Sequence, residues 1–132
     1  MWADLCSAAR EAASHAYAPY SNFRVGAAVL ADGRVFKGAN MENATLPAGV
    51  CAERVALSAA RIAGAGPATG LALYFPDVAK GSPVSMMVPC GICRQWLAEL
   101  APDCRIWICQ IGVSFAVPEL LPNAFSLRRD DG

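Results

Sequence analysis

The chain has 132 residues, a length typical of one domain, and its 11 basic and 11 acidic side chains cancel. Neither sign of charge is concentrated, which argues against a nucleic-acid partner. The longest uncharged stretch, residues 62–76, is shorter than the roughly 20 apolar residues of a membrane span. Hydrophobic residues make up 55% of the chain, which is high for a monomer and predicts an oligomer. No basic segment leads into an apolar run at the N-terminus, so we expect a cytoplasmic protein with reduced cysteines.

The hydrophobic pattern predicts an alternation of helices and strands along the chain. Helical spacing covers residues 4–17, 51–64 and 90–100, and strand-like runs cover residues 23–30, 34–41, 71–75 and 105–111. Asp32-Gly33, between the first two strands, is typical of a β-hairpin turn. Loops are expected over residues 17–22 and 76–89, whereas residues 115–121 fit no pattern. This order predicts an α/β domain in which helices pack on a sheet.

Two short motifs carry the candidate chemistry, Cys51-Ala52-Glu53 and Pro89-Cys90-Gly91-Ile92-Cys93. Each motif begins a predicted helix, where the partial positive charge of the N-terminus favours thiolate over thiol. Three protein ligands leave a tetrahedral zinc ion with one position for water. We therefore predict a catalytic zinc site built from Cys51, Cys90 and Cys93. Arg54, next to the first motif, would offset the excess negative charge of three thiolates.

Glu53 follows Cys51 by two residues, which places the two side chains about 200° apart on a regular helix. Both can face one bound water only if Cys51 occupies the position where the helix begins. Glu53 can then act as general base toward that water and as general acid toward a substrate.

The two motifs together resemble the zinc-dependent cytidine deaminase family, whose signature pairs a ligand and a Glu with Pro-Cys-x-x-Cys. Residues 20–28, 38–44 and 120–125 are similar to three further blocks of the family, so the resemblance covers nearly the whole chain. It implies a three-layer α-β-α cytidine deaminase-like fold over residues 1–132. The mixed sheet would have about five strands, with helices on both faces. It also implies Zn²⁺ as cofactor and a homotetramer with shared active sites.

The resemblance further implies a reaction and a set of site residues. The reaction is hydrolytic deamination of cytidine and 2′-deoxycytidine to uridine and 2′-deoxyuridine, a step of pyrimidine salvage. The implied roles are zinc binding by Cys51, Cys90 and Cys93, proton transfer by Glu53, ribose binding by Asn40 and Glu42, base or substrate contact by Phe23 and Ala52, charge balance by Arg54, and insertion of Phe125 into a neighbouring subunit's site.

Three departures from the family pattern bear on the substrate. Leu46 stands where many relatives carry Tyr, Val88 stands where Ser commonly precedes Pro-Cys, and residues 73–76 are bulkier than usual. They leave open a modified cytosine nucleoside, such as an antibiotic resembling blasticidin S. A deaminase that edits polynucleotides is disfavoured because no basic channel is visible.

Structural interpretations of the same residues also remain open. The cysteines could form a purely structural zinc site, or a non-catalytic binding module, with a fourth ligand from Cys6, Cys104, Cys109, His15 or Glu53. The spare cysteines Cys6, Cys104 and Cys109 are otherwise expected to be small apolar core residues. Gly26 and Gly38 are expected to allow close backbone packing. Simple structural roles are also open for His15, Phe23, Asn40, Glu42, Arg54 and Phe125.

Overall fold

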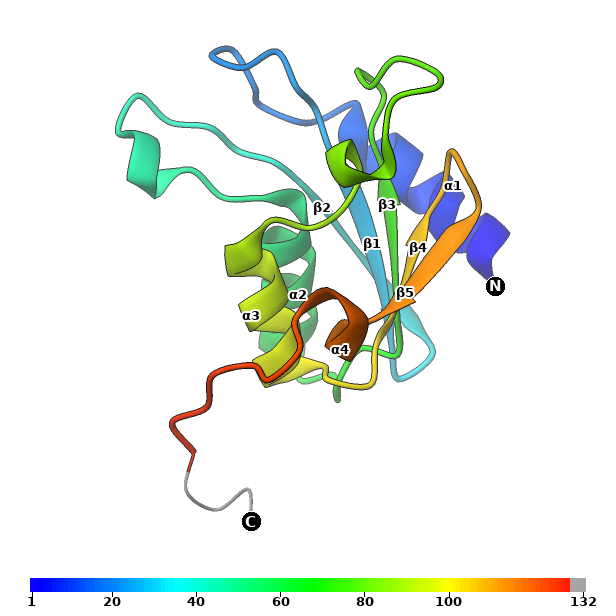
Figure 1. Ribbon diagram of the computed structural model, residues 1–132, viewed down its shortest axis with the longest axis vertical. Coiled ribbons are helices and arrows are strands. Elements are labelled where there is room, and N and C mark those ends of the chain that lie inside the picture. Colours follow the sequence, from blue (N-terminus) through cyan, green and yellow to red (C-terminus); the bar gives the residue numbers. More distant parts are fainter. Residues whose placement is uncertain (129–132) are drawn as a thin grey trace.

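The computed structural model describes residues 1–128 and contains a five-stranded mixed sheet between layers of helices (Figure 1). The longer elements are α1 (Trp2–Ala13), β1 (Gly26–Ala31), β2 (Arg34–Ala39), α2 (Ala52–Ile62), β3 (Gly70–Tyr74), α3 (Gly91–Leu100), β4 (Arg105–Ile108), β5 (Val113–Ala116) and α4 (Val117–Leu120). Two 3-10 turns, η1 (Leu46–Ala48) and η2 (Val84–Met86), lie in the loops before α2 and α3. The predicted three-layer α/β fold is confirmed. None of the helices in residues 1–128 combines the length and apolar character needed to cross a membrane.

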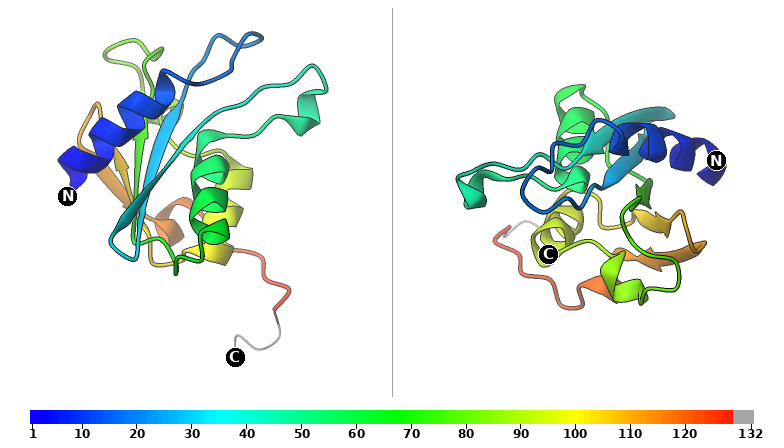
Figure 2. Two further views of the ribbon diagram at one scale, coloured as in Figure 1. Left: turned by 180° about the vertical axis from the view of Figure 1, so that it is seen from behind. Right: turned by 90° about the horizontal axis from the view of Figure 1, so that it is seen from above.

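The strands lie in the order β2-β1-β3-β4-β5, and only β3 and β4 run parallel. Helix α1 covers one face of the sheet, while α2 and α3 cover the other (Figure 2). Because both faces are covered, the central strands are apolar on both sides. In β1, Ala27 and Val29 belong to the larger core on the α2 side, whereas Ala28 packs with Leu5 and Ala9 of α1.

Two glycines let the helices lie unusually close to the sheet, as the sequence predicted. A Cβ atom on Gly26 would lie 1.9 Å from the carbonyl oxygen of Ala9 in α1. A Cβ atom on Gly38 would lie 2.4 Å from the carbonyl oxygen of Ala52, the first residue of α2. Gly38 therefore fixes how closely the N-terminal turn of α2 approaches β2.

The predicted bounds of the first helix and the first strand were wrong, because contacts with Asn40 replace the regular backbone bonds there. Helix α1 ends at Ala13 rather than at residue 17, and Tyr17 instead donates its backbone N–H to the Asn40 carbonyl at 2.9 Å. Strand β1 begins at Gly26 rather than at Phe23. The Asn40 carboxamide binds the Phe23 carbonyl and the Val25 N–H, both at 2.8 Å, and so takes the place of ladder bonds.

The predicted strand over residues 105–111 is wrong as a single element. Strand β4 ends at Ile108, a turn follows with Gly112 at φ +63°, and β5 returns antiparallel to β4. The segment over residues 115–121, which fitted no pattern, contains the end of β5 and the short helix α4.

Two predictions about the spare cysteines were wrong for Cys6 and Cys109, which are neither reduced nor free apolar core residues. Cys6 of α1 and Cys109 of the turn after β4 form a disulfide, with their Cα atoms 5.8 Å apart. Next to this bond, Trp2 and Trp107 stack with ring centroids 5.5 Å apart. Cys104 is a buried free thiol, as expected.

Candidate active site

The N-termini of α2 and α3 meet at one point on the α2 side of the sheet. Cys51 is the N-cap residue of α2 and Cys90 is that of α3, both with extended backbone, and Cys93 lies buried in the first turn of α3. Cys51 thus occupies the position where its helix begins, as a shared site with Glu53 requires. The Cys51 and Cys90 sulfurs are 3.7 Å apart, and those of Cys90 and Cys93 are 3.6 Å apart.

The sulfur positions fit a zinc ion. Zinc–thiolate bonds of about 2.3 Å in a tetrahedron imply sulfur–sulfur distances of about 3.8 Å. All three sulfurs lie within 4.8 Å of one another. In residues 1–128 this group contains three ligands and no fourth Cys, His or carboxylate.

None of the five candidates for a fourth ligand joins this group in residues 1–128. Glu53 lines the same cavity as Cys51 and Cys90, but its carboxylate is not part of the group, and the other four candidates lie elsewhere. Cys6 and Cys109 are bonded to each other, and burial raises the pKa of the Cys104 thiol to about 12. His15 is exposed just beyond the end of α1. The structure therefore offers the three-ligand arrangement that leaves one coordination position open.

The contacts within the cysteine group favour the thiolate form of Cys51. The Cys93 thiol donates a hydrogen bond to the Cys51 sulfur, and this contact, aided by Arg54, lowers the pKa of Cys51 to about 5 against the effect of burial. The guanidinium of Arg54 places Nη2 3.8 Å from the Cys51 sulfur. The Nε atom of Arg54 is buried and has no hydrogen-bond partner in residues 1–128. The interaction of Arg54 with the cysteine group is therefore mainly electrostatic.

Glu53 has 4% of its surface exposed and is the only buried carboxylate in residues 1–128. It lies in the first turn of α2 and lines the same cavity as Cys51 and Cys90. Burial raises the pKa of its carboxyl to about 7, and the nearby charge of Cys51 adds to this rise. A carboxyl group in this environment is suited to both accepting and donating a proton.

The cavity brings together most of the residues that the sequence singled out. Cys51, Glu53 and Cys90 line it together with Phe23 and further apolar side chains. The complete lining consists of Ser21, Phe23, Val25, Asn40, Glu42, Cys51, Ala52, Glu53, Phe75, Met86, Val88 and Cys90. An apolar pocket with a few convergent polar groups is the usual form of a small-molecule site.

The polar residues of the cavity already have partners in the chain. The Glu42 carboxylate accepts hydrogen bonds from the backbone N–H groups of Tyr20 and Ser21, each at 3.0 Å, and from the Ser21 hydroxyl. Asn40 uses one N–H and one lone pair for Phe23 and Val25. A carboxamide has a second N–H and a second lone pair, so Asn40 can position the pocket and still bind a ligand.

Phe125 lies apart from the residues that line the cavity. It belongs to the segment after α4, is 68% exposed, and is attached to α3 by a 2.8 Å hydrogen bond from Gln95 to its carbonyl. The structure therefore does not bring Phe125 to the site of its own chain.

Several lining residues were not predicted as site residues. Ser21 lay in a quoted family block, and Val88 and residues 73–76 were noted only as departures. Phe75, directly after β3, packs near Phe23 with ring centroids 6.2 Å apart. Met86 lies in a loop without periodicity, and no signal in the sequence marks it.

Comparison with known proteins agrees with this geometry. The family model of the cytidine and deoxycytidylate deaminase zinc-binding region matches residues 3–109. The chain is 41% identical to the cytidine deaminase of Halalkalibacterium halodurans over 127 residues, which cover 92% of each protein. It is similar to the crystal structure of cytidine deaminase from Burkholderia pseudomallei, with 39% identity, a TM-score of 0.83, and coverage of 95% of this chain and 99% of that one. It is also similar to the crystal structure of cytidine deaminase from Mycobacterium tuberculosis, with 38% identity and a TM-score of 0.81. That match covers 96% of this chain and 98% of the other.

Proposed function

The chain belongs to the zinc-dependent cytidine deaminase family and is a hydrolase of that kind, and from this we propose that it deaminates free cytidine and 2′-deoxycytidine to uridine and 2′-deoxyuridine. The observation that carries the proposal is the buried Glu53 carboxylate beside three convergent thiolates in one cavity. The whole chain acts as one catalytic domain in this proposal. The reaction takes place in the cytoplasm, in the salvage of pyrimidine nucleosides.

Cys51, Cys90 and Cys93 hold the metal ion. Zinc with three protein ligands supplies an open position for water and lowers the pKa of that water. Glu53 accepts a proton from the attacking water and donates it to ring N3, while the water oxygen bonds to C4. Glu53 then transfers the second proton from that oxygen to the amino group, the C4–N bond breaks, and ammonia leaves. Arg54 balances the net negative charge that three thiolates leave on a divalent ion.

The nucleoside lies along the cavity with its base toward Glu53. The aromatic face of Phe23 packs on the base, and Ala52 borders it at the start of α2. Glu42, a carboxylate without a proton of its own, accepts hydrogen bonds from the sugar hydroxyls. The free N–H and lone pair of Asn40 face the same sugar. Binding of the sugar competes with the hydrogen bonds that Glu42 accepts from Ser21.

The alternative functions are not favoured. Relatives that match over nine-tenths of the chain are named cytidine deaminases, and Glu53 gives the metal site a buried acid–base group that a non-catalytic module does not need. Of the departures that left a modified nucleoside open, Leu46 is 74% exposed and lines a hollow with Tyr20 and Glu42 rather than the cavity of Glu53. Val88 and Phe75 do line that cavity, so the panel of nucleosides below includes a modified one.

The proposal includes a homotetramer with shared sites. Phe125 and Leu127 of the final described segment are strongly exposed, as are Ile62 at the end of α2 and Ile92 in α3. Apolar surface of this kind is stabilised when a second copy covers it. Phe125, which is exposed in its own chain, then completes a neighbour's site. Light scattering measures the assembly, and an active monomer at assay concentration contradicts this part of the proposal.

A kinetic experiment with Glu53→Gln tests the reaction. Cytidine, 2′-deoxycytidine and a blasticidin-like nucleoside are assayed for ammonia release, and zinc is measured in the same samples. We expect the wild type to act on the first two, with about one zinc ion per chain. Glu53→Gln keeps the zinc but loses about 100- to 10,000-fold in kcat, the usual contribution of a general acid–base group. A fully active variant, or a wild type inactive on both nucleosides, refutes the proposal.

A further inference from the structure

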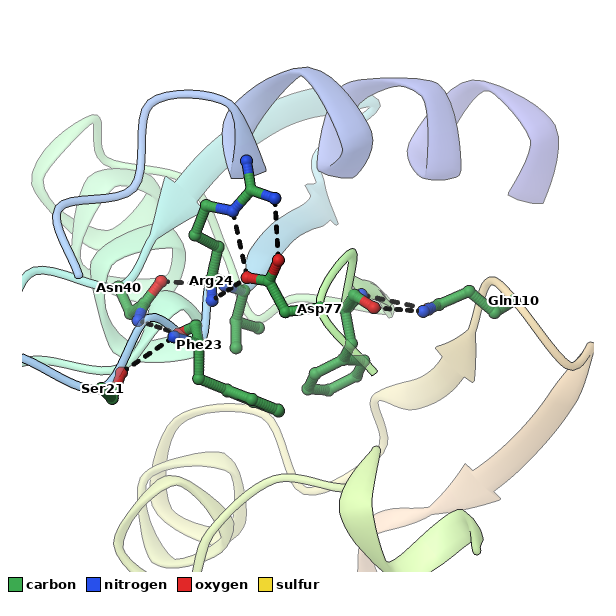
Figure 3. A network of polar contacts seen from close by, with 8 residues as sticks. Ser21, Phe23, Arg24, Asn40, Asp77 and Gln110 are labelled. Carbon is green, nitrogen blue, oxygen red and sulfur yellow. Dashed lines mark hydrogen bonds and ion pairs between the residues drawn. The ribbon is translucent and has the colours of Figure 1, made fainter. Parts of the chain in front are cut away.

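Two polar side chains outside the cavity hold the backbone next to its aromatic wall. Gln110, in the turn after β4, accepts a hydrogen bond from the Phe75 N–H at 3.0 Å and donates one to the Phe75 carbonyl. Asp77 accepts hydrogen bonds from the backbone N–H of Arg24 at 2.8 Å and from its guanidinium at 3.0 and 2.8 Å. Figure 3 shows both contacts beside the bonds between Asn40 and the segment of Phe23.

The position of Phe75 in the fold explains why it needs such a contact. Strand β3 ends at Tyr74, so the backbone of Phe75 has left the sheet ladder. Its side chain is nevertheless buried and lines the cavity with Phe23 and Glu53. The Gln110 carboxamide imitates one more step of a neighbouring strand, because it pairs with both the N–H and the carbonyl of the same residue.

The second contact fixes the opposite side of the aromatic pair. Arg24 directly follows Phe23, and Asp77 lies two residues after Phe75. The Arg24–Asp77 contact therefore joins the two segments that carry the aromatic rings. The paired carboxylate and guanidinium restrict the relative orientation of the segments as well as their distance.

On the basis of the proposed function, we propose that Gln110 and Asp77 are positioning residues that hold Phe75 and Phe23 in place against the cytosine ring. Neither side chain lines the cavity, so they act through the backbone of the aromatic residues. The turn with Gln110 is itself anchored, because Cys109 is bonded to Cys6 and donates its N–H to the Leu73 carbonyl at 3.0 Å. Substrate affinity thus depends on a turn that the chemistry does not touch.

A double-mutant cycle tests the coupling between Gln110 and Phe75. Gln110→Ala, Phe75→Leu and the double variant are assayed for KM and kcat with cytidine, well below their melting temperatures. Loss of one or two backbone hydrogen bonds predicts a KM increase of about five- to thirtyfold for Gln110→Ala, with a much smaller change in kcat. The double variant should resemble Phe75→Leu alone, because residues that act as a unit are not additive. Asp77→Asn should raise KM as well, like Gln110→Ala.

Asp32→Ala is the matched control. The Asp32 carboxylate also joins two loops through a backbone contact, to the Gly66 N–H at 2.8 Å, but at the end of β1 remote from the cavity. It should lower the melting temperature and leave KM unchanged. Amide hydrogen exchange gives a readout that does not need catalysis: the Phe75 amide should exchange faster in Gln110→Ala and at the wild-type rate in Asp32→Ala.

The outcomes separate this proposal from the proposed function. A wild type that does not deaminate cytidine overturns the proposed function and the substrate role of the aromatic pair. If the wild type is active, an unchanged KM or an unchanged Phe75 exchange rate in Gln110→Ala overturns the positioning role and leaves the proposed function standing. Additive effects of Gln110→Ala and Phe75→Leu on KM overturn it as well.

Discussion

Replacing Gly38 with alanine should push the metal-binding end of α2 away from the sheet. The new Cβ atom would lie 2.4 Å from the Ala52 carbonyl oxygen and 2.5 Å from the Ala56 nitrogen. Both are backbone atoms of α2, so no side-chain rotation relieves the contact. Restoring an ordinary contact of about 3.4 Å requires an outward movement of about 1 Å at Ala52.

This displacement acts directly on the candidate site. Cys51 precedes Ala52 and Glu53 follows it, so both move with the first turn of α2. Overpacking of this kind costs about 1–3 kcal/mol of unfolding free energy. A misplacement of about 1 Å at reacting groups costs about 100-fold in rate. We therefore expect Gly38→Ala to have a lower zinc content and a lower kcat than its loss of stability alone would explain.

Gly33→Ala provides the control for this experiment. Gly33 lies in the β1–β2 turn at φ +71° with nothing within 4 Å of an added Cβ atom. Alanine there costs about 1–3 kcal/mol through backbone strain but does not touch α2. Zinc content, denaturant unfolding and cytidine turnover are measured for both variants. If the two variants are equally stable and Gly38→Ala has the same zinc content and kcat as Gly33→Ala, the close approach of β2 to α2 does not position the site.

Three further outcomes are expected. Cys93→Ser should lose most of its zinc by metal analysis, because two thiolates remain, whereas Cys104→Ser should keep it. Glu42→Gln should raise KM for cytidine about tenfold or more with zinc retained; if Ser21→Ala has the same effect, Glu42 only orders the loop. Cys6→Ser should lower the free energy of unfolding by about 2–5 kcal/mol, because the disulfide closes a loop with a sequence separation of 103 residues. A reductant should destabilise the wild type and not the variant. Equal sensitivity of the two proteins to the reductant contradicts this account.

The elements whose identity depends on local pattern could be predicted from the sequence. The apolar spacing of α2 and α3 and the Asp32-Gly33 turn are local signals, and the structure has the corresponding elements. The motifs of Cys51 and Cys90 are local too, and each cysteine caps a helix as expected. A helix N-terminus is specified by a few consecutive residues, so the place of each cysteine at a helix start could be predicted. The approach of the Cys51 and Cys90 sulfurs to 3.7 Å, across 39 residues of sequence, is a tertiary contact that the motifs alone do not encode.

The remaining features depend on contacts between distant segments. The start of β1 could not be placed because the side chain of Asn40, 15 residues beyond Val25, replaces the ladder there. The contact of Gln110 with Phe75 spans 35 residues, and the disulfide of Cys6 spans 103. No periodicity encodes such pairs, because each depends on where two elements cross in space.

This division follows the chemistry of the site. Cys51 and Glu53 share the first turn of α2, and Cys90 and Cys93 share that of α3, so each short motif places its own pair of side chains. In the proposed function the pocket wall must instead match a flat aromatic base, and the shape of that wall depends on segments that leave the sheet at the ends of β3 and β4. Backbone outside a ladder needs other partners for its N–H and carbonyl groups. Asn40, Asp77 and Gln110 supply those partners, and none of them belongs to the cysteine motifs. If the proposed positioning role is right, substrate affinity can therefore change through these three residues while the zinc motifs stay the same.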